Sequence, residues 1–171
     1  PNGWLSRNVV RGQSDIVVYF SGHGIAIQKD KSTGILPFDV DPNYSVGLPL
    51  KKLYKDLNTM GARSVTVYLD ACFTGQTRDA KMLIADARPI IILPKEQDIP
   101  DKVNVLSAAS GSQISGAIKE KEHGLFTYYV LRGLSGDADT NKDKVVKLKE
   151  LSDYVSKNVK EQAALNGREQ F

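Results

Sequence analysis

The sequence contains few of the residues that form disulfides or bind metals. Its 171 residues include one cysteine, two histidines, two methionines and one tryptophan. A single cysteine cannot form an intrachain disulfide, so the fold must be held by its apolar core, as is usual in reducing compartments. A cytoplasmic location is therefore expected.

Long hydrophobic runs and concentrated charge are absent as well. No apolar stretch approaches the roughly 18 residues of a membrane-spanning helix, and none has the pattern of a secretory leader. The 23 basic residues are scattered among 20 acidic ones, for a net charge of +3. A solvated surface explains this pattern better than a nucleic-acid-binding stripe does. We expect neither a membrane nor a nucleic-acid partner.

The remaining composition is that of a globular domain, with 41% hydrophobic and 25% charged residues. The β-branched and aromatic runs at 15–20 (DIVVYF) and 64–69 (SVTVYL) predict buried strands, and 103–109 is a third candidate. Apolar residues at helical spacing predict helices over 49–60, 125–134 and 147–159.

Alternating strands and helices predict an α/β fold, a three-layer α/β/α sandwich with a mainly parallel sheet. Residues 25–46 should form a small hairpin or loop excursion. Three strands are few for a sheet covered on both faces, and the chain begins at Pro1 rather than Met, so we expect further strands upstream. The stretch 76–102 is interpreted as a long connection within one domain, 1–171.

Two reactive side chains follow two of the predicted strands. The first strand runs into SGHG, with His23, and the second into DACFTG, with Cys72. Because the carboxyl ends of parallel strands meet at one edge of a sheet, both side chains should emerge together. A neighbouring imidazole lowers the pKa of a thiol and activates it. The glycines beside His23 predict a sharp turn, after which the amides of Gly24 and Cys72 would face a developing oxyanion.

Each residue alone also has a structural explanation. A lone cysteine in an apolar strand is usually a small buried hydrophobe. A histidine between glycines is more often a turn residue than a base. Their shared position at the ends of two parallel strands favours the nucleophile interpretation for Cys72.

These motifs resemble those of a known family. YFSGHG, followed 49 residues later by LDACFTG, is similar to the catalytic histidine and cysteine motifs of the caspase-like clan, closest to metacaspases and bacterial caspase-like peptidases. ILPFDVDP, VNVLSAASGSQIS and EHGLFTYYVLRGL extend the resemblance over most of 4–159. The resemblance implies a caspase-like cysteine endopeptidase with a His23–Cys72 dyad, Gly24 as an oxyanion donor, a protein or peptide substrate, and no cofactor for the chemistry.

The resemblance also implies a role for Asp70, the acid of the Asp-x-Cys motif with which metacaspases bind a basic P1 side chain. Because side chains alternate along a strand, Asp70 should share a face with Cys72. We therefore expect cleavage after Arg or Lys. The alternative is a structural acid, bonded to nearby amides or orienting His23.

The sequence departs from the family at two points. Metacaspases usually carry Cys-His-Ser-Gly where this chain has CFTG at 72–75, which leaves the dyad intact but the subfamily open. There is no convincing final strand after the last helix, the element through which animal caspases dimerise. No caspase-type dimer is expected.

Two other functions stay open. Residues 72–78 fit the Cys-x-x-Gly-x-x-Arg loop of tyrosine phosphatases, in which backbone amides and Arg78 would bind a phosphate. Asp70 and Asp79 beside a dianion argue against it, as does an SGHG motif left without a role. A catalytically silent caspase-like scaffold would typically have lost the histidine or the cysteine, and this chain has both.

A calcium loop is possible between the last two predicted helices. Positions one, three, five and twelve of an EF-hand-like loop are held by Asp139, Asn141, Asp143 and Glu150. Lys144 stands where the turn favours glycine, and Lys147 adds positive charge. The alternative is a polar loop in which an aspartate caps a helix.

Overall fold

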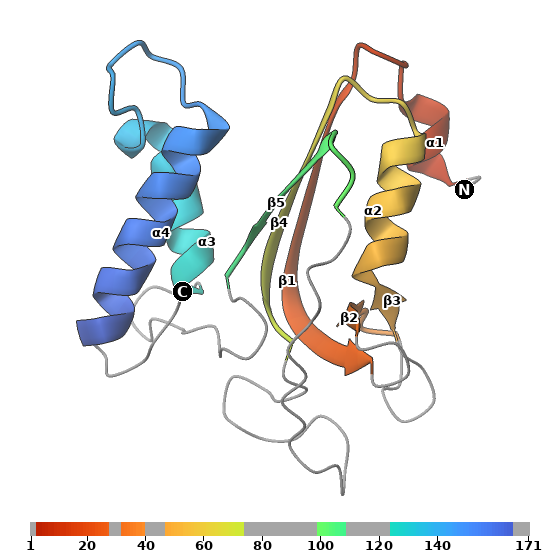
Figure 1. Ribbon diagram of the computed structural model, residues 1–171, viewed down its shortest axis with the longest axis horizontal. Helices are drawn as coiled ribbons and strands as arrows, with labels where there is room; N and C mark the ends of the chain where they lie inside the picture. The colour runs from red at the N-terminus through yellow and green to blue at the C-terminus, as the bar shows by residue number, and fades with distance from the viewer. Residues whose placement is uncertain (1–2, 28–31, 40–46, 74–98, 109–123, 166–171) are drawn as a thin grey trace, which may run out of the picture.

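The computed structural model describes residues 3–27, 32–39, 47–73, 99–108 and 124–165. They form three layers, with a sheet between two pairs of helices (Figure 1). The elements are α1 (Trp4–Asn8), β1 (Asp15–Ile27), β2 (Ser32–Leu36), β3 (Leu48–Pro49), α2 (Leu50–Thr59), β4 (Ser64–Cys72), β5 (Val103–Ser107), α3 (Leu125–Arg132), a π-helical turn (Gly133–Asp137) and α4 (Leu148–Leu165). The predicted α/β/α sandwich is confirmed.

The sheet has five strands in the order β3-β2-β1-β4-β5. Strands β1, β4 and β5 are parallel, as predicted, and β2 and β3 add antiparallel at one side. The register of β1 on β4 runs from Asp15 opposite Ser64 to His23 opposite Cys72. The carboxyl ends of these two strands therefore lie side by side.

One face of the sheet is apolar and is covered by α2. In β4 this face presents Val65, Val67 and Leu69, each at most 1% exposed. Helix α2 packs Tyr54 and Leu57 into the same cluster. The helix begins after Pro49, whose φ is fixed near the helical value, and the chain leaves it at Gly61, whose φ of 70° few other residues adopt.

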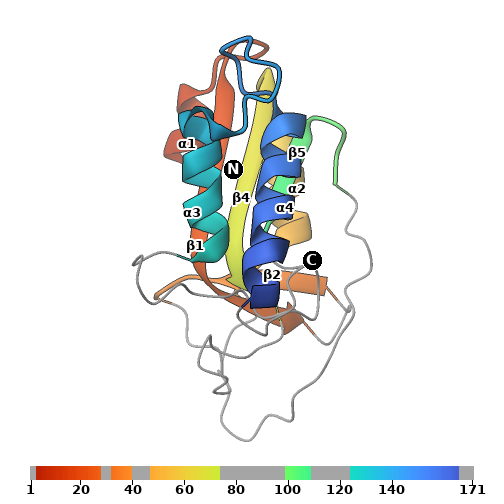
Figure 2. The same cartoon turned by 90° about the vertical axis from the view of Figure 1, so that its left-hand side faces the viewer.

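The opposite face carries the polar residues and is covered by α3 and α4, which lie over the sheet in Figure 2. Tyr68 and Leu106 of the sheet pack here against Phe126 of α3 and Leu151 and Val155 of α4. This second cluster holds α3 against the carboxyl half of β4, where the candidate site lies.

The structure corrects the expected turn at His23. Strand β1 continues through SGHG to Ile27, and neither Gly22 nor Gly24 has a positive φ. The chain stays extended because residues 23–27 pair antiparallel with β2. Within the stretch 25–46, where a hairpin or loop excursion was expected, residues 32–36 form the partner strand β2.

Two short elements, α1 and β3, were not predicted, because neither is long enough to show a periodic apolar pattern. Helix α4 extends to Leu165, beyond the predicted 147–159. Most of the connection 76–102 lies outside the described residues, so its interpretation stays a prediction.

The amino ends of β1 and β4 are joined by a charged clamp. The Asp15 carboxylate accepts hydrogen bonds from Arg63 Nε at 2.9 Å and Ser64 Oγ at 2.7 Å, and Arg63 Nη2 pairs with its second oxygen. The backbone N–H of Arg63 donates to the carbonyl of Ser14 at 2.8 Å. The clamp thus fixes the pairing at the first step of the β1–β4 register.

We expect Asp15→Asn to make the free energy of unfolding less dependent on pH in the acid range. Hydrogen bonds from Arg63 and Ser64 lower the pKa of Asp15 from 3.8 to about 2, so the ionised carboxylate stabilises the fold above its unfolded pKa. That contribution is lost as the pH falls through the folded value. Urea unfolding at a series of pH values from 3.8 down to about 2 measures the free energy of unfolding, which should fall less steeply in the variant than in the wild type.

The matched control is Asp153→Asn, which removes an exposed carboxylate paired with Lys149 one turn away on α4. Any change in acid slope that Asp15→Asn shares with this variant is a general effect of removing an exposed, paired carboxylate. An acid slope unchanged in Asp15→Asn would contradict the role of the clamp.

Candidate active site

His23 and Cys72 lie at the carboxyl ends of neighbouring parallel strands. His23 is an exposed residue of β1, and Cys72 is the last residue of β4. The two are register partners, and adjacent strands run about 4.8 Å apart. The structure therefore brings together the two residues that sequence reasoning singled out.

Gly24 follows His23 within β1 and is buried. It is the register partner of Ile35 in β2. The predicted oxyanion donor is therefore part of a strand rather than a turn, and its role in catalysis stays a prediction.

Asp70 lies two residues before Cys72 and is the register partner of Ser21. Its side chain is 0% exposed. Thr127 Oγ1 of α3 donates a hydrogen bond to Asp70 Oδ2 at 2.5 Å, and Thr127 Oγ1 lies 2.8 Å from the hydroxyl of Tyr19 in β1. Three elements thus converge on one carboxylate.

Gly124 lets α3 approach that carboxylate. It caps the amino end of α3 with no side-chain hydrogen bond of its own. A Cβ at this position would lie 2.1 Å from Asp70 Oδ2, which is far inside van der Waals contact. Only glycine fits between the helix start and Asp70.

Sequence reasoning missed Tyr19, Thr127 and Gly124 as parts of the site. Tyr19 stands four residues before His23 on a strand, a spacing that places both on one face. Thr127 and Gly124 belong to EHGLFTYYVLRGL, a segment that extended the family resemblance without implying a role for either residue. Nothing in the spacing indicates that they meet Asp70.

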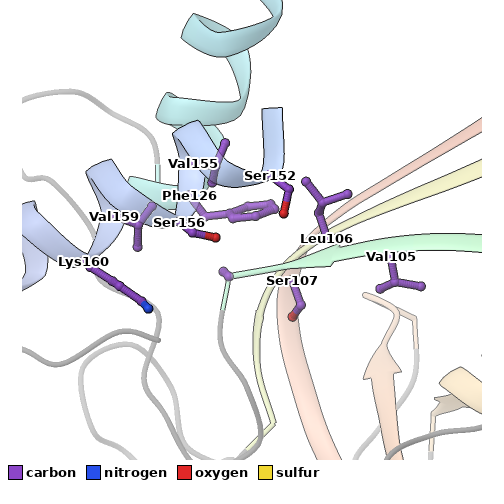
Figure 3. Close-up of a pocket in the computed structure, with 10 residues that line it drawn as sticks. Val105, Leu106, Ser107, Phe126, Ser152, Val155, Ser156, Val159 and Lys160 are labelled. Carbon is purple, nitrogen blue, oxygen red and sulfur yellow. The ribbon is translucent and has the colours of Figure 1, made fainter. Parts of the chain in front are cut away.

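A small cavity opens at the carboxyl end of β5, between this strand and α4, with a volume of about 160 Å³. Apolar side chains, among them Leu106, Phe126 and Val155, line it, with Ser156 and Lys160 also at its wall (Figure 3). Its described lining includes neither His23 nor Asp70. The cavity is therefore lined by residues other than those of the described candidate site.

The predicted calcium loop is closed by its own hydrogen bonds. Its four candidate ligands are Asp139, Asn141, Asp143 and Glu150. Asp139 Oδ2 accepts the N–H of Lys144 at 2.8 Å, and Asn141 Oδ1 accepts the N–H of Asp143 at 2.8 Å. Lys144 adopts a φ of 67°, the conformation that glycine usually supplies. The turn that appeared to need glycine therefore forms with lysine.

Lys147 bonds to two of the candidate calcium ligands. Its ammonium lies 2.9 Å from Asp143 Oδ2, and its backbone N–H donates to Glu150 Oε2 at 3.0 Å. These bonds lower the pKa of both carboxyls. Among the residues that the structure describes, no three His, Cys, Asp or Glu side chains are grouped to hold a metal ion. In this arrangement Lys147 is bonded to oxygens of Asp143 and Glu150 that a calcium ion would need, and calcium binding stays a prediction.

The three-layer sandwich, with a histidine and a cysteine side by side at the ends of its central strands, is the arrangement expected of a caspase-like fold. The family model of the caspase domain, peptidase family C14, matches residues 2–171. The chain belongs to this family, and its predicted membership of the caspase-like cysteine peptidases is confirmed. No curated protein matches the sequence. Every described helix is too short or too polar to cross a membrane.

We expect Lys147→Gln to bind calcium more tightly than the wild type, because the ammonium on Asp143 repels a second cation and competes for the same oxygen. Glu150→Gln should abolish binding by removing the last ligand. Isothermal titration of the three proteins with calcium measures both effects. Absence of heat from all three would rule out the site.

Proposed function

We propose that the protein is a cysteine endopeptidase that uses His23 and Cys72 as its catalytic dyad. The observation that carries the proposal is their register pairing at the carboxyl ends of β1 and β4. Membership in the caspase domain family supports it. The same membership gives no support to a phosphatase loop at 72–78.

In the proposed reaction, the His23 imidazole accepts the proton of the Cys72 thiol, and the thiolate attacks the peptide carbonyl. Backbone N–H groups, for which Gly24 and Cys72 are the candidates, stabilise the oxyanion of the tetrahedral intermediate. His23 then protonates the leaving amine, and water hydrolyses the thioester. No cofactor is needed for these steps.

We propose that the enzyme cleaves after Arg or Lys. Asp70 places a carboxylate two residues before Cys72. Because Asp70 is 0% exposed, its pairing with a substrate guanidinium or ammonium requires that substrate binding uncover the carboxylate. A charge-assisted hydrogen bond of this kind corresponds to about 10- to 150-fold in discrimination. The bond from Thr127 also suits a purely structural acid, and the two roles differ in P1 preference.

We expect Cys72→Ala and His23→Ala each to abolish peptide hydrolysis and to leave the fold intact. Because the two groups act in the same steps, the double variant should be no slower than either single one. Turnover of a fluorogenic peptide measures this, with circular dichroism as the check on folding. Near wild-type turnover in His23→Ala would remove His23 from the mechanism.

We expect a positional-scanning peptide library to show Arg or Lys at P1. In Asp70→Asn, which keeps the shape of the side chain and removes its charge, kcat/KM should fall mainly for the basic substrates, by roughly 10- to 150-fold. A profile with Asp at P1, as in animal caspases, would overturn the preference and leave the dyad in place.

A further inference from the structure

Three side chains on three elements form a continuous hydrogen-bonded chain on the α3 side of the sheet. It runs from Tyr19 in β1 through Thr127 in α3 to Asp70 in β4. Tyr19 is 52% exposed, Thr127 is 8% exposed and Asp70 is 0% exposed. The chain therefore connects the protein surface to a buried carboxylate.

The two hydroxyl groups of this hydrogen-bonded series can donate their protons in one direction only. The Thr127 hydroxyl has a single proton, and it is donated to Asp70 Oδ2. The Tyr19 hydroxyl must then donate to Thr127 Oγ1. Each donated bond polarises the next, so both hydroxyls contribute to the bond that Asp70 Oδ2 accepts.

The orientation of the Asp70 carboxylate depends on the same bond. The terminal torsion of an aspartate has broad, nearly two-fold preferences, so packing and hydrogen bonds decide where its oxygens point. Thr127 binds Oδ2 from one side, and Gly124 lies against it, with room for no Cβ. The first turn of α3 thus holds this oxygen in place.

We propose that Thr127 is a positioning residue for substrate specificity, with Tyr19 as its support. By fixing the orientation of the Asp70 carboxylate, this hydroxyl chain sets how strongly a basic P1 side chain is preferred. The inference rests on the proposed peptidase function. Thr127 does not touch the reacting atoms, so its loss should change substrate preference rather than the chemistry of Cys72.

The test compares two peptides that differ only at P1, one with arginine and one with citrulline, which has the same shape without the charge. Thr127→Val removes the hydroxyl and keeps the volume. We expect it to lower the arginine-to-citrulline ratio of kcat/KM by roughly 10-fold or more, because a hydrogen bond to a charged group is lost. Tyr19→Phe should lower the ratio less. Thr127→Ser, which keeps the hydroxyl, should keep the wild-type ratio.

The controls separate positioning from stability. Thr66→Val makes the same change on β4, four residues before Asp70, and Tyr129→Phe removes a hydroxyl from α3; both should keep the wild-type ratio. Melting temperatures show which variants fold. In the Asp70→Asn background, Thr127→Val should cause little further loss, because the two residues act through one bond.

The outcomes are distinguishable. A wild-type protein that hydrolyses neither peptide overturns the proposed function, and the inference with it. A wild type that prefers arginine, together with an unchanged or increased ratio in folded Thr127→Val, overturns the inference alone. A similar loss for both peptides in Thr127→Val assigns the residue a structural role and also overturns it.

Discussion

The register of β1 on β4 is the constraint on which the candidate site depends. A parallel pair shifted by one residue would turn every side chain of one strand to the opposite face. The Asp15 clamp pairs the two strands at their amino ends, eight residues before His23. The apolar residues of β4 are then buried only if they point to the face of the sheet that α2 covers. Together these contacts determine that His23 is opposite Cys72.

The two faces of the sheet differ in composition and in what they contribute. The α2 face is a continuous apolar cluster that contributes stability, and each of its β4 side chains is almost fully buried. The α3 face mixes apolar contacts, such as Tyr68 on Phe126, with the buried carboxylate of Asp70. Burying a carboxylate is costly unless it is hydrogen-bonded. This cost explains why α3 brings the Thr127 hydroxyl to that point.

Much of this architecture can be predicted from the sequence, because it depends on local patterns. The β-branched runs predict β1 and β4, and the leucine spacing predicts α2. That His23 and Cys72 lie at the same edge of the sheet follows from parallel strands, whereas their direct pairing depends on the register. The path of β1 through SGHG could not be predicted, because pairing with β2 decides whether two glycines turn or stay extended. The contact of Thr127 with Asp70 joins residues 57 positions apart and leaves no periodic signal.

Asp70 therefore has two roles that cannot be separated by changing one residue. It accepts the bond that anchors the first turn of α3, and in the proposed function its charge selects the substrate. A larger or apolar side chain at this position would leave the Thr127 hydroxyl without its buried acceptor and would press on Gly124. In the proposed function, the start of α3 therefore belongs to the specificity site together with the strand that carries Cys72.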